Sequence, residues 1–336
     1  MFRFIRSILF LLPPEKAHYV TMDLLLFLVQ FPLTSWVFSW LYPKVHKPVE
    51  VCGLQFPNRV GLAAGFDKDA RYMPVFKALG FGFMEIGTIT PVAQSGNDKP
   101  RLFRLPEDKA LINRLGFNNL GLDQAIEQLK KRPVGILVGG NIGKNKVTPN
   151  ELAVQDYERC FLGLFPYVDY FTVNVSSPNT PNLRELQEKK PLTELLSRLM
   201  QLNHGQEKAK PIFLKIAPDL TDGQLDDIVA IVFETGIHGI VATNTTVERS
   251  LTHTPKEKVD ALGAGGLSGA PVFKRSTEVL AYLQRKSEGK FPIMGVGGIL
   301  SAADAQKKLD AGAPLVQLYT GFIYKGPSLV HAIARL

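Results

Sequence analysis

Residues 170–218 read YFTVNVSSPNTPNLRELQEKKPLTELLSRLMQLNHGQEKAKPIFLKIAP and contain one complete strand–helix–strand repeat. The first run, YFTVNVSS (170–177), is apolar and partly β-branched until it ends in serines. An amphipathic stretch follows at 192–202, and a second apolar run, IFLKIAP, occupies 212–218. Two short apolar runs joined by a helical pattern predict parallel strands with a crossover helix.

The same repeat recurs along the chain from Val51 onward. Six further apolar runs end in Gly or Thr: VGLAAG (60–65), FMEIGT (83–88), VGILVGGNIG (134–143), GIVATNT (239–245), IMGVGG (293–298) and LVQLYTG (315–321). Further helical patterns lie at 224–235, 277–286 and 302–311. Eight strands alternating with helices predict an α/β fold, a (β/α)8 TIM barrel of about 250 residues.

A doubly wound parallel sheet is the alternative architecture. Five or six strands and one dominant glycine-rich loop would be more typical of it. In the barrel interpretation, the connections after the second and sixth strands are long, and we expect them to form lids or caps.

The composition excludes several classes of protein. The chain has 336 residues, 45% hydrophobic and 21% charged, which rules out a disordered or collagen-like protein. Its two cysteines, Cys52 and Cys160, form no CxxC pair, and the histidines form no HxH or HExxH pattern, so we expect no metal site. The net charge of +8 suits an anionic substrate, a phosphate-bearing cofactor, an anionic membrane surface or RNA.

The first 45 residues differ in character from the rest of the chain. Within MFRFIRSILFLL (1–12), Arg3, Arg6 and Ser7 lie on one helical face and apolar residues lie opposite. Pro13-Pro14 ends this helix, and Pro32 interrupts the apolar run that follows. We therefore expect a small α-helical extension at 1–45, followed by a barrel domain at 46–336.

Three roles compete for this extension. A secretory signal fits poorly, because no small-residue cleavage site follows the apolar stretch. A transmembrane helix at Leu24–Leu41 approaches the length of a span, but Pro32 would kink it near its middle. We favour short amphipathic helices that lie on a membrane or cap an apolar pocket, while a soluble helical cap stays open. Arg3, Arg6 and Lys16 would add attraction to anionic lipid.

Polar residues gather where the predicted strands end. The carboxyl ends of all strands in such a barrel meet on one face, where barrel active sites lie. The residues concerned are Lys68, Thr88, Asn141, Lys144, Asn174, Ser176, Ser177, Asn179, Thr243, Asn244 and Thr245. Taken singly, each could serve only in a turn or a cap, but their recurrence from strand to strand favours a site.

Glycine-rich turns and one lysine indicate which kind of cofactor the site could bind. GGLSG (265–269), GVGGI (295–299) and YTG (319–321) lie near the last strands, where barrels often bind phosphate. Lys215 lies inside an apolar strand, where an ammonium is costly unless it is paired or used. It could form a Schiff base or place positive charge beside an electron-rich ring. Together with the asparagines, these features suggest redox chemistry with flavin mononucleotide (FMN).

Eleven short motifs, spread from residue 63 to residue 327, can be compared in their order with those of known families. They are AAGFDKD (63–69), EIGTITP (85–91), GNDKPRLFRL (96–105), INRLGFNNLG (112–121), NIGKNK (141–146), NVSSPNTPNLR (174–184), KIAPDL (215–220), ATNTT (242–246), GGLSG (265–269), GVGGI (295–299) and QLYTGFIYKGP (317–327). With the pattern PPEKAH (13–18), the chain resembles the quinone-dependent, membrane-associated class (class 2) of the dihydroorotate dehydrogenase family. The resemblance implies oxidation of dihydroorotate to orotate in pyrimidine biosynthesis, with FMN as cofactor and a membrane quinone as acceptor.

The resemblance also implies binding residues. For FMN they are Ala64, Gly65, Phe66, Asp67, Lys68, Thr88, Asn141, Asn174, Lys215, Thr243, Gly269, Gly298, Tyr319 and Thr320. For dihydroorotate they are Lys68, Asn113, Arg114, Leu115, Gly116, Phe117, Asn174, Asn179, Asn244 and Thr245. Lys215 would face the N1/O2 edge of the flavin, while the glycines and the amides of Tyr319 and Thr320 would hold its phosphate.

By the same resemblance, Ser177 would be the catalytic base. It would take the C5 proton while hydride passes from C6 to flavin N5. Burial under a closing loop and a proton path through Thr180, flanked by Phe117, would assist this serine. Lys215 completes the predicted catalytic set. The soluble class uses a cysteine as base, and neither cysteine of this chain falls at that place.

The resemblance further implies how the quinone arrives. The N-terminal helices would form an apolar tunnel, with His18, Arg104 and Tyr319 as polar contacts at its inner end. We expect a monomer attached peripherally to the cytoplasmic side of the cell membrane, without a nucleic-acid partner. The alternative function is that of another FMN-dependent barrel, similar to dihydrouridine synthase. Such an enzyme would want a catalytic cysteine in an active-site loop and an RNA-binding domain, and the sequence indicates neither.

Overall fold

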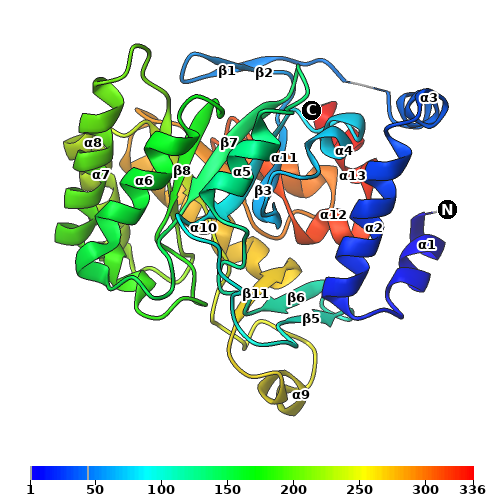
Figure 1. Cartoon of the computed structure of the whole chain (residues 1–336). Helices are drawn as coiled ribbons and strands as arrows, with labels where there is room; N and C mark the ends of the chain where they lie inside the picture. The colour runs from blue at the N-terminus through cyan, green and yellow to red at the C-terminus, as the bar shows by residue number, and fades with distance from the viewer. Residues whose placement is uncertain (1, 44) are drawn as a thin grey trace.

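A closed barrel of eight parallel strands forms the centre of the molecule (Figure 1). The structure is a computed structural model that describes residues 2–43 and 45–336. In chain order the barrel strands are β3 (Val60–Asp67), β4 (Phe83–Ile89), β7 (Leu137–Ile142), β8 (Tyr170–Asn174), β9 (Ile212–Ile216), β10 (Gly239–Ala242), β12 (Ile293–Val296) and β13 (Val316–Leu318). The last strand pairs with the first, so the predicted (β/α)8 barrel and its eight strands are confirmed.

Helices follow the strands and cover the outside of the barrel (Figure 1). They are α4 (Met73–Ala78), α5 (Leu122–Leu129), α6 (Ala153–Leu164), α7 (Lys189–His204), α8 (Asp222–Thr235), α10 (Phe273–Lys286), α11 (Ala302–Asp310), α12 (Thr320–Lys325) and α13 (Pro327–Ala334), with 3-10 turns at Asn150–Leu152, Leu183–Gln187 and Ala270–Val272. The boundaries follow local sequence signals. In α8, for example, Thr221 and Gln224 form a capping box at the start, and Gly236 adopts φ 71° at the end.

A hairpin closes the end of the barrel at which the strands begin. It consists of β1 (Val49–Val51) and β2 (Leu54–Phe56). The buried ring of Phe56 lies 5.0 Å from that of Phe83 and 6.2 Å from that of Tyr170, measured between centroids. Phe83 and Tyr170 are the first residues of β4 and β8. The amino end of the barrel is therefore filled by aromatic side chains.

A second, smaller sheet lies at the opposite end of the barrel (Figure 1). β5 (Leu102–Leu105) and β6 (Ala110–Asn113) come from the long connection after β4, whereas β11 (Gly266–Gly269) comes from the connection after β10, which also holds α9 (Lys256–Ala261). The three strands pair antiparallel in the order β11–β6–β5. The two connections that were predicted to form lids or caps thus join in one sheet.

Three short helices precede the barrel: α1 (Phe2–Leu9), α2 (Pro14–Leu28) and α3 (Pro32–Leu41). The second and third begin at prolines, so the predicted breaks at Pro13-Pro14 and Pro32 are confirmed. Within the described ranges, no single helix has the length and apolar character needed to cross a bilayer. Residues 14–28 and 32–38 meet that test only as a pair, and the pair is bent by 104°.

Polar contacts attach α2 to the barrel domain. The Arg101 guanidinium lies 2.7 Å from the Glu15 carboxylate, and both side chains are largely buried. Burial alone would raise the pKa of Glu15, but the hydrogen bond and charge of Arg101 hold that pKa below its usual value. Further along the helix, Asp23 accepts a hydrogen bond of 2.8 Å from the Tyr72 hydroxyl, and Met22 is buried in the core. The helix is thus anchored at two separate points.

The first helix lies with a basic side chain toward the barrel. Arg6 Nη1 donates a hydrogen bond of 2.8 Å to the Tyr324 carbonyl, and the ring of Phe10 packs edge-on against that of Tyr324. The guanidinium of Arg6 is thus directed toward a carbonyl of the barrel domain, while its attraction to anionic lipid stays a prediction. The side chain of Arg3 lies outside the described residues.

Apolar side chains of the three helices and of the turns between them are exposed. They are Phe4, Ile5, Ile8, Leu11, Val20, Leu24, Phe27, Phe31, Leu33, Trp36, Val37, Trp40 and Leu41, and we call them the N-terminal apolar surface. So many exposed large apolar side chains within one short segment mark an interaction site more often than an ordinary protein face.

We expect Phe56→Ala to lower the free energy of unfolding by about 3–5 kcal/mol, because it opens a cavity against Phe83 and Tyr170. Urea unfolding followed by circular dichroism measures the change. The matched control is Gln55→Ala, at the exposed neighbouring position of β2, which should alter stability by less than about 0.5 kcal/mol. Similar losses in the two variants would contradict the role of Phe56 as a plug.

Candidate active site

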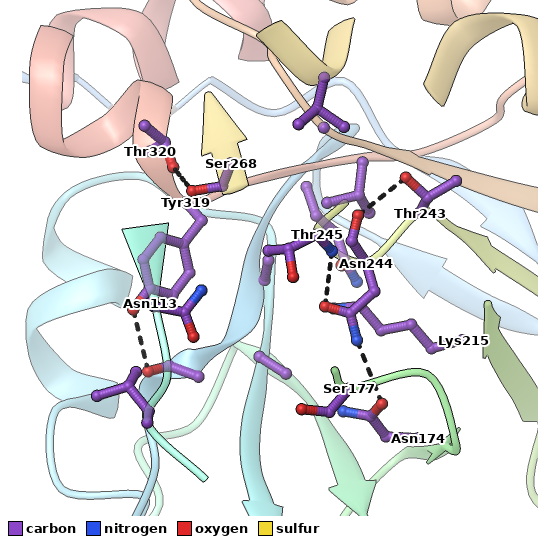
Figure 2. A pocket seen from close by; sticks show the side chains of 18 of the residues that line it. Asn113, Asn174, Ser177, Lys215, Thr243, Asn244, Thr245, Ser268, Tyr319 and Thr320 are labelled. Carbon is purple, nitrogen blue, oxygen red and sulfur yellow. Dashed lines mark hydrogen bonds between the residues drawn. The ribbon is translucent and has the colours of Figure 1, made fainter. Parts of the chain in front are cut away.

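One cavity opens at the carboxyl end of the barrel strands. Its empty volume is about 1030 Å³, including open solvent at the mouth. The structure brings these predicted residues together in its lining: Ala64, Gly65, Lys68, Thr88, Asn113, Leu115, Gly116, Phe117, Asn174, Ser177, Asn179, Lys215, Thr243, Asn244, Thr245, Gly269, Gly298, Tyr319 and Thr320. Figure 2 shows Ser268 and Thr320 toward one end of the cavity, and Asn174 and Ser177 toward the other.

A cluster of amides and hydroxyls forms the wall beside β8. Asn174 Nδ2 donates hydrogen bonds of 2.9 Å to Thr88 Oγ1 and 3.2 Å to Asn141 Oδ1. Asn244 Nδ2 donates to Asn174 Oδ1 at 3.4 Å, a contact drawn in Figure 2, and to Ser176 Oγ at 2.9 Å. Each amide is therefore fixed in orientation before a ligand arrives. An array of fixed donors and acceptors suits a flat polar ring.

One layer deeper in the barrel, Glu85 is a fully buried carboxylate that the sequence analysis did not single out. It accepts hydrogen bonds from Asn141 Nδ2 at 3.1 Å, Thr172 Oγ1 at 3.0 Å and Gln317 Nε2 at 2.5 Å. A signal for it existed, since an acid inside the apolar run FMEIGT is as unusual as Lys215 inside its own strand.

Two lysines present positive charge to the cavity. Lys215 in β9 is paired in register with Asn174, and none of the described residues accepts a hydrogen bond from its Nζ. Burial lowers the pKa of Lys215, and the negative charge of Glu85 opposes this shift. Burial likewise lowers the pKa of Lys68, which follows β3. Two cations in one cavity favour an anionic or electron-rich ligand.

Two loops beside the cavity are tied to each other. Asn179 Nδ2 donates a hydrogen bond of 3.1 Å to Asn113 Oδ1. Asn97 Nδ2 donates to the carbonyls of Arg114, at 3.0 Å, and of Asn179, at 3.1 Å. The segment after β6 and the segment after β8 are therefore held in a common arrangement, and both carry predicted substrate residues.

Ser177 lies in the loop after β8 and faces the cavity with 6% of its surface exposed. Its Oγ accepts a hydrogen bond of 3.3 Å from the backbone N–H of Asn179. Three residues further on, Thr180 Oγ1 is buried and has no hydrogen-bond partner in the described part of the chain. An unpaired buried hydroxyl calls for an explanation, such as an ordered water or a role in proton transfer.

Glycine turns form the opposite end of the cavity. Gly269 has φ 97° and Gly298 has φ 74°, backbone angles that other residues rarely adopt. A Cβ at Gly269 would lie 2.7 Å from Ala110 Cα, and one at Gly298 would lie 2.6 Å from Phe273 Cα. No larger residue fits at either place without a shift of the backbone. Close backbone turns with exposed amides are a common way to bind phosphate.

Other predicted residues do not line the cavity: Phe66, Asp67, Asn141, Arg114 and Thr180. Asp67 accepts hydrogen bonds from the backbone of Arg71 at 2.9 Å and of Tyr72 at 2.8 Å, and burial raises its pKa to about 6. Arg114 donates to the carbonyl of Leu262. These side chains support the wall rather than face its interior.

The lining also contains residues that the sequence analysis did not assign: Ala63, Ser268, Val272, Val296, Gly297, Ile299, Gln317, Leu318 and Gly321. Ser268 and Gly297 belong to the motifs GGLSG and GVGGI, so the signal for them was the motif itself. Ser268 Oγ lies 2.8 Å from Thr320 Oγ1, which adds hydroxyl groups beside the glycine turns.

Three aromatic rings connect α2 with the cavity. The ring of Phe66 lies 4.9 Å from that of His18 and 5.2 Å from that of Tyr319, which lines the cavity. Burial, together with the charge of Lys68, lowers the pKa of His18 to about 3, so this imidazole is neutral at physiological pH.

Arg104, the third predicted quinone contact, is engaged with the extension. Its Nη1 donates to the carbonyls of Phe10, at 3.2 Å, and Leu12, at 2.8 Å. The guanidinium also lies 4.3 Å from the centroid of the Phe10 ring. These hydrogen bonds therefore hold the segment between α1 and α2, and Arg104 is not among the residues that line the cavity.

The chain matches known proteins over nearly its whole length. The sequence model of the dihydroorotate dehydrogenase family matches residues 47–336. Among relatives named dihydroorotate dehydrogenase (quinone), that of Christiangramia forsetii is 56% identical over 332 residues (98% of this chain, 96% of the relative), and that of Coxiella burnetii is 49% identical over 346 residues (100% and 96%). The crystal structure of Eimeria tenella dihydroorotate dehydrogenase with ferulenol is similar at a TM-score of 0.84 and 35% identity, covering 96% of this chain and 90% of that one. The chain therefore belongs to the dihydroorotate dehydrogenase family of oxidoreductases, in its quinone-dependent class.

Proposed function

We propose that the protein oxidises (S)-dihydroorotate to orotate in pyrimidine (UMP) biosynthesis, with FMN as redox cofactor and a membrane quinone as electron acceptor. The observation that supports this most is one cavity that has Ser268 and Thr320 toward one end and Ser177 with its neighbouring amides toward the other (Figure 2). Its lining includes the turns at Gly269 and Gly297–Gly298, which we call the glycine cradle. A phosphate-bearing cofactor and a small polar substrate would lie side by side in this cavity. The family assignment favours this reaction over that of a dihydrouridine synthase-like enzyme.

FMN, when bound, supplies an N5 atom that accepts hydride from C6 of the substrate, and it passes the electrons on to the quinone. The residues present fit this group. Gly269 and Gly298 form tight turns with positive φ in the lining of the cavity, as turns that bind phosphate through backbone amides do, and the Lys215 ammonium has no acceptor among the described residues. Tyr319 and Thr320 would bind the phosphate through their amides, while Lys215 would stabilise negative charge at the N1/O2 edge.

The substrate would be bound by four amides: Asn113, Asn174, Asn179 and Asn244. Each offers a donor and an acceptor, as the imide groups of the ring require. The hydrogen bonds of these amides to one another already fix their orientation, so little ordering remains to be done when substrate binds. Lys68 would meet the negative charge of the substrate carboxylate.

Ser177 would remove the C5 proton. A serine hydroxyl is a weak base, and its low exposure helps, because a closed site excludes water and strengthens local electrostatics. The buried hydroxyl of Thr180, which has no hydrogen-bond partner among the described residues, would take part in passing the proton onward, and Phe117 lines the cavity.

The extension, residues 1–45, would attach the enzyme peripherally to the cytoplasmic side of the cell membrane. Its N-terminal apolar surface includes Trp36 and Trp40, which are 64% and 71% exposed, and tryptophan prefers the interface between lipid and water. The quinone would leave the bilayer between these helices and approach the flavin along the path of His18, Phe66 and Tyr319.

We expect Ser177→Ala to retain FMN but to reduce the flavin at least 100-fold more slowly when dihydroorotate is mixed with it at neutral pH. The loss corresponds to removal of a general base, which typically contributes about 10²–10⁴ in rate. Stopped-flow absorbance of the flavin measures the reduction directly, without the quinone.

The matched control is Ser95→Ala, which removes the same hydroxyl from an exposed loop and should leave the rate unchanged. Ser177→Cys keeps a group that can accept a proton and should recover part of the activity. A normal rate of flavin reduction in Ser177→Ala would overturn the assignment of the base.

We also expect the double variant Trp36→Ser/Trp40→Ser to bind about tenfold or more weakly to vesicles of phosphatidylcholine and phosphatidylglycerol, because it removes exposed aromatic surface from α3. Vesicle sedimentation measures the binding. Flavin reduction by dihydroorotate should not change, since the cavity is untouched.

Val134→Ser/Val147→Ser is the control for this variant, because both valines are exposed, at 89% and 91%, and lie in the barrel domain. It should bind vesicles as the unmodified protein does. If the two double variants lost binding equally, the N-terminal apolar surface would not be the membrane contact.

A further inference from the structure

Lys308, in α11, is a buried cation that the proposed mechanism does not use. It has no exposed surface, and no ion pair within residues 2–43 and 45–336 includes it. Its Nζ donates a hydrogen bond of 2.7 Å to Ser276 Oγ and lies 5.3 Å from the centroid of the Phe273 ring. Burial lowers the pKa of Lys308 to about 7, with Asp304 opposing the shift. Such a group is costly to bury without a function or a partner.

Ser276 connects this lysine to the glycine cradle. Its Oγ lies 3.2 Å from the carbonyl oxygen of Gly297 and 3.1 Å from that of Phe273, so it can donate to either. The Gly297–Gly298 turn follows β12, and Phe273 is the first residue of α10. Through Ser276, Lys308 is therefore linked to the contact between the Gly297–Gly298 turn and the start of α10.

The Gly297–Gly298 turn packs closely against the start of α10. A Cβ added to Gly298 would lie 2.7 Å from the backbone nitrogen of Phe273. Gly297, Gly298 and Val272, which precedes α10, all line the cavity. A displacement of Ser276 would therefore shift the cradle itself.

Asp304, the carboxylate whose charge acts on Lys308, forms no ion pair with it in the described chain. Asp304 Oδ2 accepts a hydrogen bond of 3.0 Å from the backbone N–H of Leu300, in the turn before α11. The positive charge of Lys308 thus adds to that of the N-terminus of α10, which has the same sign. Both lie on the protein side of the cradle, where they favour an anion on its open side.

We propose that Lys308 is a positioning residue for the phosphate of the cofactor: it fixes the Gly297–Gly298 turn through Ser276 and, in its protonated form, supplies a buried positive charge behind it. The inference rests on the proposed function, because it requires a phosphate in the cradle. It differs from direct binding, since the lysine acts through Ser276 and does not face the cavity.

The test compares the affinity of full-length protein for FMN and for riboflavin, which lacks the phosphate. Lys308→Met keeps most of the buried side-chain volume and removes the charge. We expect its dissociation constant for FMN to rise about tenfold or more, and that for riboflavin to stay within about twofold. Flavin is released from the purified holoenzyme by dilution, and rebinding is followed by quenching of flavin fluorescence.

Two further variants complete the experiment. Lys307→Met removes the same charge from the adjacent, exposed position of α11, 5.9 Å from the same Phe273 ring, and should leave both affinities unchanged. Ser276→Ala breaks the link to the turn and should also weaken FMN selectively, which keeps the proposal testable if Lys308→Met does not fold.

The outcomes distinguish a failure of the role of Lys308 from a failure of the proposed function. A selective loss for FMN in Lys308→Met and Ser276→Ala supports the proposal. Equal losses for FMN and riboflavin, or no loss, would overturn it, because the lysine would then serve packing alone. If the unmodified protein itself bound FMN no better than riboflavin, the cradle would not hold phosphate and the proposed function would fail at that step.

Discussion

The carboxylate of Glu85 is the constraint on which the active end of the barrel depends. A charge inside a packed barrel must be satisfied by hydrogen bonds, and its donors come from β7, β8 and β13: Asn141, Thr172 and Gln317. Because Asn141 gives its N–H to Glu85, its oxygen is left for Thr88 and Asn174. The direction of the cavity amides thus follows from one acid in the layer below them.

A second chain of contacts links the extension to the loops beside the cavity. Arg101 pairs with Glu15 of α2 and also donates a hydrogen bond of 2.9 Å to the carbonyl of Asn97. The side chain of Asn97 in turn holds the carbonyls of Arg114 and Asn179. The same arginine therefore supports the helix on the outside and the segments around the substrate residues on the inside. A displacement of α2 can therefore be transmitted to those segments through Arg101 and Asn97.

Much of this architecture is predictable from the sequence because it depends on local patterns. The eight strands follow from short β-rich runs between helical patterns, and the breaks in the extension follow from Pro13-Pro14 and Pro32. Most lining residues follow from strand ends and from the family motifs. Tertiary packing decides the rest. The amphipathic pattern places Arg6 on the polar face of its helix, but it does not show that the carbonyl of Tyr324 accepts a hydrogen bond from it. Likewise, the sequence AADAQKKLD (302–310) does not show that Lys308 is buried while Lys307 is exposed.

The orientation of α1 has a consequence for the protein in water. With Arg6 turned toward the barrel, the side chains of Phe4, Ile8 and Leu11 are 71%, 53% and 84% exposed. In buffer, two copies that meet through these side chains remove apolar area from water, and nothing in such a contact fixes a symmetry or a number of copies. We therefore expect the particle size measured without detergent to depend on protein concentration.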